Sequence, residues 1–216
     1  MSEPDVKLDD DRHMVTITFA TTPSATLKPE RPMGNDADFL TDRRLLEGLT
    51  IRARAAYYLA VAESVFAAAP PDDGSLEPAR QAVNMAWQWI EGAPVEAVAL
   101  DWCLENEETG LQYFKSNACI AVSAALAYVT WRAYQVEGGK NNPNMGQTIC
   151  EVTEEMIVEL HRFAEQTGRF DHQLAHRLLN YLRANYTASK IDDLGGPILR
   201  RDIVSGANIE SLKKSD

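Results

Sequence analysis

The stretch SNACIAVSAALAYVTW, from Ser116 to Trp131, is the longest in the chain without a charged side chain. It includes Ser, Asn and Thr, and it falls short of the roughly 18 to 20 apolar residues that a membrane span needs. Aliphatic and Ala residues lie on several faces of the helix that it predicts, as in the central helix of a bundle. We therefore expect a buried core helix over about 111–136 and no interaction with a membrane.

Helical periodicity continues on both sides of this stretch, where apolar residues recur at spacings of three and four. Thr41 or Asp42 offers an N-cap for the first predicted helix, and Ser75 offers one for the second. The predicted helices cover about 38–70, 75–92, 94–104, 111–136, 148–167 and 171–187. Since no second half of the chain is rich in strands, the sequence predicts an all-α multi-helix bundle of about six helices. Short connections make successive helices antiparallel neighbours.

The two ends of the chain differ from this helical region. The alternating run from Val15 to Phe19 predicts a short β-like arm, and three prolines follow it between residues 23 and 32. One strand cannot satisfy its own backbone groups, so it pairs with another segment, pairs with a partner, or stays unformed. Beyond residue 191 the periodicity weakens at Gly195-Gly196-Pro197. The predicted organisation is an N-terminal arm at 1–35, an all-α helical domain at 36–190 and a C-terminal tail at 191–216.

Composition limits the partners and the location of the protein. Its 216 residues include 32 Asp and Glu against 21 Lys and Arg, a formal net charge of −11. This charge disfavours attraction to nucleic-acid phosphates or anionic lipid and favours a basic partner. The acidic N-terminus lacks the basic and apolar blocks of a signal peptide, and the three Cys residues form no C-x-x-C pair. We therefore expect a cytoplasmic protein that binds neither nucleic acid nor membrane.

No arrangement of residues marks an active site. His172 and His176 share a helix face and could in principle hold a metal together with Asp171 or His161. The pair lacks the Glu of a zinc protease, and a helical wheel places both rings opposite the Leu face of the helix, so surface histidines are the simpler interpretation. The chain has no Glu-x-x-His motif, no Gly-x-Ser-x-Gly nucleophile and no phosphate-binding glycine loop. We expect no catalytic residue, no metal and no cofactor.

The distribution of charge is the strongest sign of a binding surface. Between Arg80 and Lys115 the chain has six carboxylates and no basic residue. Asp101, Glu105 and Glu108 fall at i, i+4 and i+7, where like charges repel by about 0.2–0.5 kcal/mol per pair. A partner that offsets this repulsion is one interpretation, and a solvated face that keeps the protein soluble is the other.

Tryptophan side chains in the same interval could anchor an interface. Trp87 joins the apolar face of its predicted helix, whereas Trp89 lies on another face, where it either packs at a helix interface or faces a partner. Trp102 lies beside the acidic stripe. The expected partner-binding residues are Trp89, Glu91, Asp101, Trp102, Glu105, Glu107 and Glu108.

Three segments of this region resemble one protein family. They are AWQWIEG (86–92), LENEETGL (104–111) and AYQVEGGKNNPNMGQTICEVTEE (133–155). Together, over about residues 80–157, they resemble the all-α immunity proteins that bacteria encode beside polymorphic toxins. The positions that match the motifs are Trp87, Trp89, Glu91, Gly92, Asn106, Glu107, Glu108, Ala133, Tyr134, Pro143 and Glu151.

The resemblance implies neutralisation of a cognate toxin by tight binding, without catalysis. Toxins that act on nucleic acid carry clefts lined by Lys and Arg, and an acidic protein can occupy such a cleft with fast, electrostatically steered association. We therefore expect an immunity protein that blocks the active site of a basic, nuclease-like toxin. The alternatives are an acidic helical regulatory or scaffolding domain without a toxin partner, and an enzyme. An adjacent toxin-like reading frame would favour the immunity protein.

Overall fold

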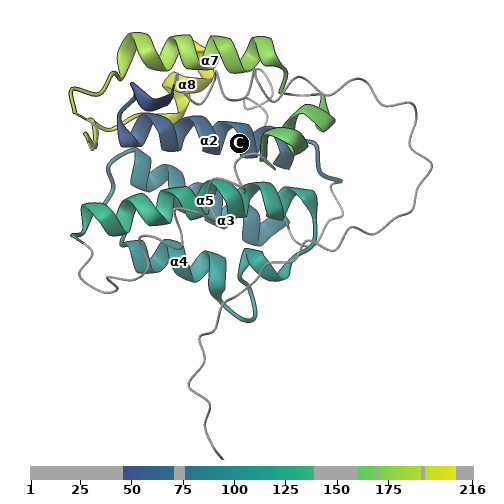
Figure 1. Cartoon of the computed structure of the whole chain (residues 1–216). Helices are drawn as coiled ribbons and strands as arrows, with labels where there is room; N and C mark the ends of the chain where they lie inside the picture. Colours follow the sequence, from purple (N-terminus) through teal and green to yellow (C-terminus); the bar gives the residue numbers. More distant parts are fainter. Residues whose placement is uncertain (1–45, 71–75, 139–159, 169, 191–192, 208–216) are drawn as a thin grey trace, which may run out of the picture. The chain divides into compact units, whose positions relative to one another are not determined.

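The computed structural model describes residues 46–70, 76–138, 160–168, 170–190 and 193–207 (Figure 1). Its helices are α2 (Ile51–Phe66), α3 (Leu76–Ile90), α4 (Ala97–Glu105), the 3₁₀ helix η1 (Leu111–Tyr113), α5 (Asn117–Val136), α7 (His172–Asn185) and α8 (Arg200–Gly206). Residues 160–167 are also helical, and the described part has one isolated antiparallel bridge, between Leu49 and Thr187. The predicted all-α fold is confirmed. The β-like run and the helix starts predicted near residues 38 and 148 lie outside the described residues.

Helices α2 and α5 lie side by side at the centre of these packed helices (Figure 1). Small side chains such as Ala53, Ala56 and Ala60 are buried along α2 and allow its neighbours to approach closely. Most of α5 is buried as well, as the uncharged stretch predicts. Helices α3 and α4 pack against α5, and α7 packs against α2. Among the described helices, none is both long and apolar enough to cross a membrane.

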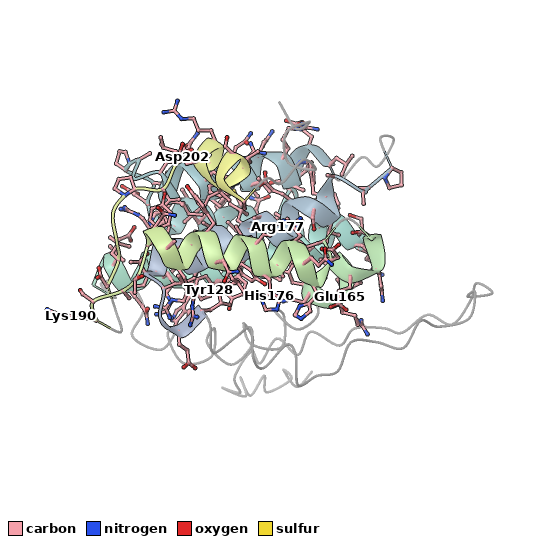
Figure 2. All side chains as sticks on the ribbon, turned by 90° about the horizontal axis from the view of Figure 1, so that it is seen from above. Tyr128, Glu165, His176, Arg177, Lys190 and Asp202 are labelled. Atoms are coloured by element: carbon pink, nitrogen blue, oxygen red, sulfur yellow. The ribbon has the colours of Figure 1, made fainter. Side chains whose placement is uncertain are left out.

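Helix α7 covers α2 with one apolar face. Leu174, Leu178 and Leu182 are buried on this face, as the periodicity predicts. Seen from above, α7 lies over the other helices, and it carries His176 and Arg177 (Figure 2). An amphipathic helix of this kind is stabilised mainly by the burial of its apolar face.

The helix predicted over 111–136 is in fact two elements. Leu111–Tyr113 forms η1, and α5 starts only after Ser116. Phe114 is extended between them, and the Ser116 hydroxyl oxygen accepts a hydrogen bond from the Cys119 N–H at 3.2 Å. A serine side chain at this position satisfies a free N–H of the first turn, which favours a new helix start. The break lets η1 pack against both α4 and α5.

The N-terminal end of α2 is closed by a segment from much later in the chain. Thr50 caps the helix by accepting a hydrogen bond from the Ala53 N–H at 3.3 Å. The Ile51 N–H donates to the carbonyl of Asp193 at 2.8 Å, and the next N–H donates to the carbonyl of Leu194 at 3.2 Å. These carbonyls satisfy donors that the first turn of a helix cannot pair internally. We call residues 193–199 the C-terminal strap.

Gly195 allows the strap to approach α2 closely. Its φ is +76°, and a Cβ atom there would lie 2.6 Å from the Thr50 side chain. Both conditions favour glycine. Beyond the strap the chain forms α8, which lies in the predicted C-terminal tail. Because α8 has seven residues and buries only Ile203, it has too little apolar periodicity to be recognised from sequence.

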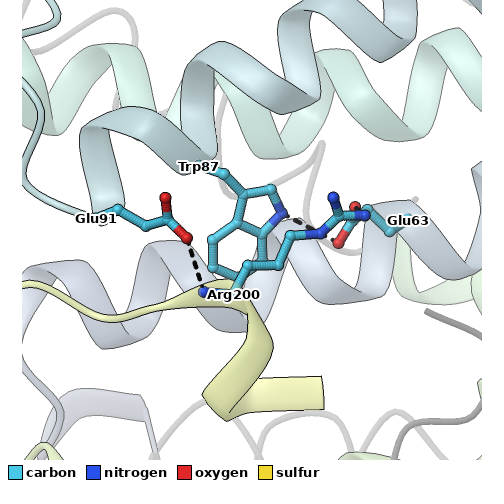
Figure 3. Close-up of polar contacts among 4 residues, drawn as sticks. All are labelled: Glu63, Trp87, Glu91 and Arg200. Atoms are coloured by element: carbon cyan, nitrogen blue, oxygen red, sulfur yellow. Dashed lines mark hydrogen bonds and ion pairs between the residues drawn. The ribbon is translucent and has the colours of Figure 1, made fainter. Parts of the chain in front are cut away.

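A buried carboxylate joins three helices. Glu63 on α2 is only 2% exposed. The Trp87 indole N–H on α3 donates to its Oε2 at 3.1 Å, and its Oε1 forms an ion pair with the Arg200 guanidinium on α8 (Figure 3). Glu91, just after α3, accepts a hydrogen bond from the backbone N–H of Arg200 at 3.0 Å (Figure 3). Because a buried charge is costly unless it is paired and hydrogen-bonded, this network fixes α8 against α2 and α3.

Loss of the buried carboxylate should cost far more stability than loss of an exposed one. Glu63→Ala removes the acceptor of the Trp87 N–H and the counter-charge of Arg200. We expect the free energy of unfolding to fall by about 3 kcal/mol. Glu63→Gln keeps an acceptor for Trp87 and should lose less. Denaturant-induced unfolding measures both variants.

Glu77→Ala is the matched control, because Glu77 forms an exposed ion pair with Arg80 at 3.8 Å. Exposed pairs contribute about 0–1 kcal/mol. An equal loss in Glu63→Ala and Glu77→Ala would contradict the structural role of the buried network.

Candidate partner-binding surface

Helix α4 is held against its neighbours by a hydrogen bond at its N-terminal end and by packing. The Ala97 N–H donates to the Glu137 carboxylate, at the end of α5, over 2.6 Å. Leu100 is fully buried, and α4 packs against α5, α3 and η1. At the other end, the Asn106 N–H donates to the carbonyl of Trp102 at 3.1 Å and completes the last turn. The exposed side chains of α4 therefore project from a fixed backbone.

Two carboxylates of α4 lie beside Tyr134 of α5. The Tyr134 hydroxyl donates to Oδ2 of Asp101 at 3.1 Å. Burial raises the pKa of Asp101, and the hydrogen bond from Tyr134 partly opposes this rise. Burial and the charge of Asp101 raise the pKa of Glu105. Burial, together with the nearby carboxylates, raises the pKa of Tyr134 to about 12, so its hydroxyl remains a donor at neutral pH.

Glu107 and Glu108 are exposed on a well-defined turn that follows α4. Oδ1 of Asn106 accepts hydrogen bonds from the backbone N–H of Glu108 at 3.0 Å and of Thr109 at 2.8 Å. Gly110 closes the turn, where a Cβ atom would lie 2.5 Å from the Asn106 carbonyl oxygen. Asn and Gly are favoured in turns for these reasons, and here they hold the two carboxylates in solvent.

The structure brings five of the seven expected partner-binding residues to α4 and this turn. Four are carboxylates, which we call the acidic surface: Asp101, Glu105, Glu107 and Glu108. The fifth is Trp102, whose side chain is 66% exposed. These five residues therefore share one location, and their contact with a partner stays a prediction.

Trp89, near the end of α3, and Glu91, just after α3, lie elsewhere: Trp89 is buried and Glu91 is half-buried. Trp89 is 5% exposed, and the Arg52 guanidinium lies over its ring, 5.7 Å from the centroid. Trp89 therefore packs inside the free chain, as the packing interpretation expects, and its contact with a partner stays a prediction. The Glu91 carboxylate accepts a hydrogen bond from the backbone N–H of Arg200 at the start of α8. Because both contacts join residues far apart in the sequence, the local helix pattern contained no sign of them.

Three exposed apolar residues on α4 and its neighbours η1 and α5 were not predicted from the sequence. Val98 on α4, Tyr113 on η1 and Val136 on α5 are 53%, 54% and 47% exposed. These three elements pack against one another. Helical spacing was a usable signal for Val98, since it stands four residues before Trp102 and shares its face.

The two histidines on α7 lie close together at the protein surface. The Nε2 atoms of His172 and His176 are 3.2 Å apart. His161, considered as a further metal ligand, lies instead beside Tyr57, with its Nε2 3.1 Å from the tyrosine hydroxyl oxygen. Within the described ranges, no three His, Cys, Asp or Glu side chains are grouped so as to hold a metal ion.

Comparison with known proteins identifies the family. The sequence model described as Immunity protein Imm6 matches residues 53–167, which are 115 of the 216 residues. The matched region runs from α2 to the helical residues 160–167 and includes the whole acidic surface. The same comparisons found no match among curated proteins or solved structures.

This match extends the resemblance seen over residues 80–157 in both directions. An immunity protein neutralises a cognate toxin and is not an enzyme. The match thus favours toxin neutralisation over a regulatory or scaffolding domain without a toxin partner. On this evidence, the chain belongs to the Imm6 family of immunity proteins.

Proposed function

We propose that this protein neutralises a basic, nuclease-like toxin in the cytoplasm by placing its acidic surface over the toxin's active site. The observation that best supports this proposal is the group of four carboxylates on α4 and the following turn. The backbone that carries them is fixed by hydrogen bonds to Glu137 and Asn106. No basic residue occurs between residues 81 and 114 to neutralise them.

Charge favours a nuclease as the target. An enzyme that cleaves nucleic acid binds phosphates with Lys and Arg side chains. A protein with a net charge of −11 attracts such a cleft over a distance and associates with it quickly. Carboxylates that reach the cleft can replace the substrate phosphates, so the toxin is inhibited without any catalysis. Because the nucleic acids at risk lie inside the cell, the cytoplasm is where this protection is needed.

Two carboxylates of the acidic surface also cost stability in the free protein. Asp101 and Glu105 are one helical turn apart, and the pKa of each is raised. A raised carboxyl pKa means that the fold disfavours the charged form. Perturbed groups of this kind concentrate at functional sites, where a partner offsets the cost. Lys and Arg side chains of a toxin would provide that compensation.

Asp101→Asn should therefore stabilise the free protein when the carboxyl would be charged. The amide still accepts the hydrogen bond from Tyr134 but removes the repulsion with Glu105. Since the folded-state pKa is raised, the cost is absent below the ordinary value of 3.8 and complete above the folded-state pKa. We expect a gain of about 0.2–0.5 kcal/mol at neutral pH and none in strong acid. Thermal melts across this pH range test it, with Glu165→Gln as an exposed control; a gain independent of pH would contradict the explanation.

A direct inhibition assay tests the proposed target. The toxin encoded beside the gene is purified and mixed with labelled DNA or RNA. We expect the toxin to degrade one of them, and an equimolar amount of this protein to stop the degradation. A toxin that binds the protein but attacks another class of substrate would refute the nuclease assignment alone. Absence of binding would refute the proposed function.

Neutralisation of the exposed carboxylates should slow association with the toxin. In the triple variant Glu105→Gln, Glu107→Gln, Glu108→Gln, we expect the association rate at low salt to fall by about tenfold or more and to depend less on salt. The control is Glu47→Gln, Glu77→Gln, Glu165→Gln, which changes the net charge equally at exposed positions away from the acidic surface. Stopped-flow or biosensor kinetics compare the two. Equal slowing in both variants would show that only the net charge matters.

A further inference from the structure

Apolar exposure is concentrated on the elements that carry the acidic surface. In the part of the chain that the structure describes, the exposed large apolar side chains are Val98, Trp102, Tyr113 and Val136. They lie on α4, η1 and the last turn of α5, which pack against one another. Trp102 is the most exposed of them, whereas Trp87 and Trp89 are buried. The exposed aromatic rings of this group therefore lie on α4 and on η1, which packs against it.

The arrangement of side chains on α4 mixes apolar and acidic groups. Val98 and Trp102 are one helical turn apart and share a face, and Glu105 is almost one turn further along the same face. Asp101 lies next to Trp102 in the sequence and forms the acidic pair with Glu105. An apolar centre bordered by charge is the usual arrangement of a protein–protein interface.

The backbone of α4, which carries Trp102, is fixed by its contacts, and this lowers the entropic cost of binding a partner. The N-terminal end of α4 is hydrogen-bonded to Glu137, the helix packs against α3, α5 and η1, and Leu100 is fully buried. Only the side-chain rotation of Trp102 remains to be fixed when a partner binds, and tryptophan has few rotatable bonds. Rings of this type are enriched among the residues that dominate interface energy.

We propose that Val98, Trp102 and Tyr113 form the apolar centre of the toxin interface, with Trp102 seated in an apolar socket that Lys or Arg residues of the toxin surround. This inference rests on the proposed function, because it uses the same toxin. The two parts of the interface have different physical roles. The acidic surface sets the rate of association, and the apolar centre sets the rate of dissociation.

A second copy of this chain fits the surface poorly. In a twofold dimer through this face, Asp101 and Glu105 of one copy would approach the same carboxylates of the other. Both groups already have raised pKa values in the single chain, and each copy carries a net charge of −11. Like charges across an interface are strongly unfavourable. A basic protein with an apolar socket meets both features of the surface.

The test compares three variants on a biosensor that carries the toxin with an inactivated active site. Trp102→Ala should raise the dissociation constant by about 30-fold or more, mainly through faster dissociation, which is the effect of removing a dominant interface residue. Trp102→Phe should retain most of the affinity. Gln173→Ala, at an exposed position on α7, is the control and should bind as the wild type does. Association rates and their salt dependence should be nearly unchanged in all three.

Val98→Glu is a second test of the apolar centre, for the case in which Trp102→Ala lowers the melting temperature. It places a carboxylate, which an apolar socket cannot accommodate, at a half-exposed helix position, and should speed dissociation about tenfold; its repulsion with Asp101 is small, so the protein stays folded. Unchanged dissociation in folded Trp102→Ala and Val98→Glu overturns the apolar centre but leaves the proposed function intact. A wild-type homodimer that Trp102→Ala converts to monomer, seen by light scattering, also overturns it. Failure of the wild type to bind the toxin refutes the proposed function itself.

Discussion

Helix α2 is buried on almost every face, and the rest of the fold is arranged around the need to cover it. A helix without a solvent face needs neighbours on all sides. Helices α5, α3 and α7 supply them, and the C-terminal strap pairs the donors at its N-terminal end. The single carboxylate inside this helix, Glu63, then requires its own partners, which Trp87 and Arg200 provide. The packing of its neighbours, the hydrogen bonds at its N-terminal end and the pairing of its carboxylate all follow from the burial of α2.

Local periodicity was sufficient to predict most of the helices. The uncharged stretch of α5 and the Leu face of α7 are patterns within single helices, so the sequence contains them in full. The break before α5 depends on the cap formed by Ser116, a contact that competes with helix continuation and leaves the apolar pattern unchanged. The strap and α8 depend on contacts such as that between Glu91 and Arg200, 109 residues apart. A short window of sequence contains no record of these partners.

In the candidate surface, too, some residues could be predicted from local sequence and others depend on tertiary contacts. Asp101, Glu105, Glu107 and Glu108 were identifiable because the absence of basic residues around them is visible in the sequence. Trp89 and Trp102 have the same chemistry, yet one lies beneath Arg52 and the other lies in solvent. Burial depends on which elements pack against each helix face, and that is decided by the tertiary structure. Val98 was missed for a related reason, because an aliphatic residue in a helix is usually assigned to the core.

The contacts at the N-terminal end of α2 come from residues that the ribosome adds late. The Arg52 side chain donates to the carbonyl of Gly195, 143 residues later, at 3.1 Å. A nascent chain that already contains α2 to α5 still lacks the strap, α7 and α8, although folding generally starts from the N-terminal part. The family match ends at residue 167, before all three. The contacts that close the N-terminal end of α2 can therefore form only after translation has passed well beyond the region that the family model matches.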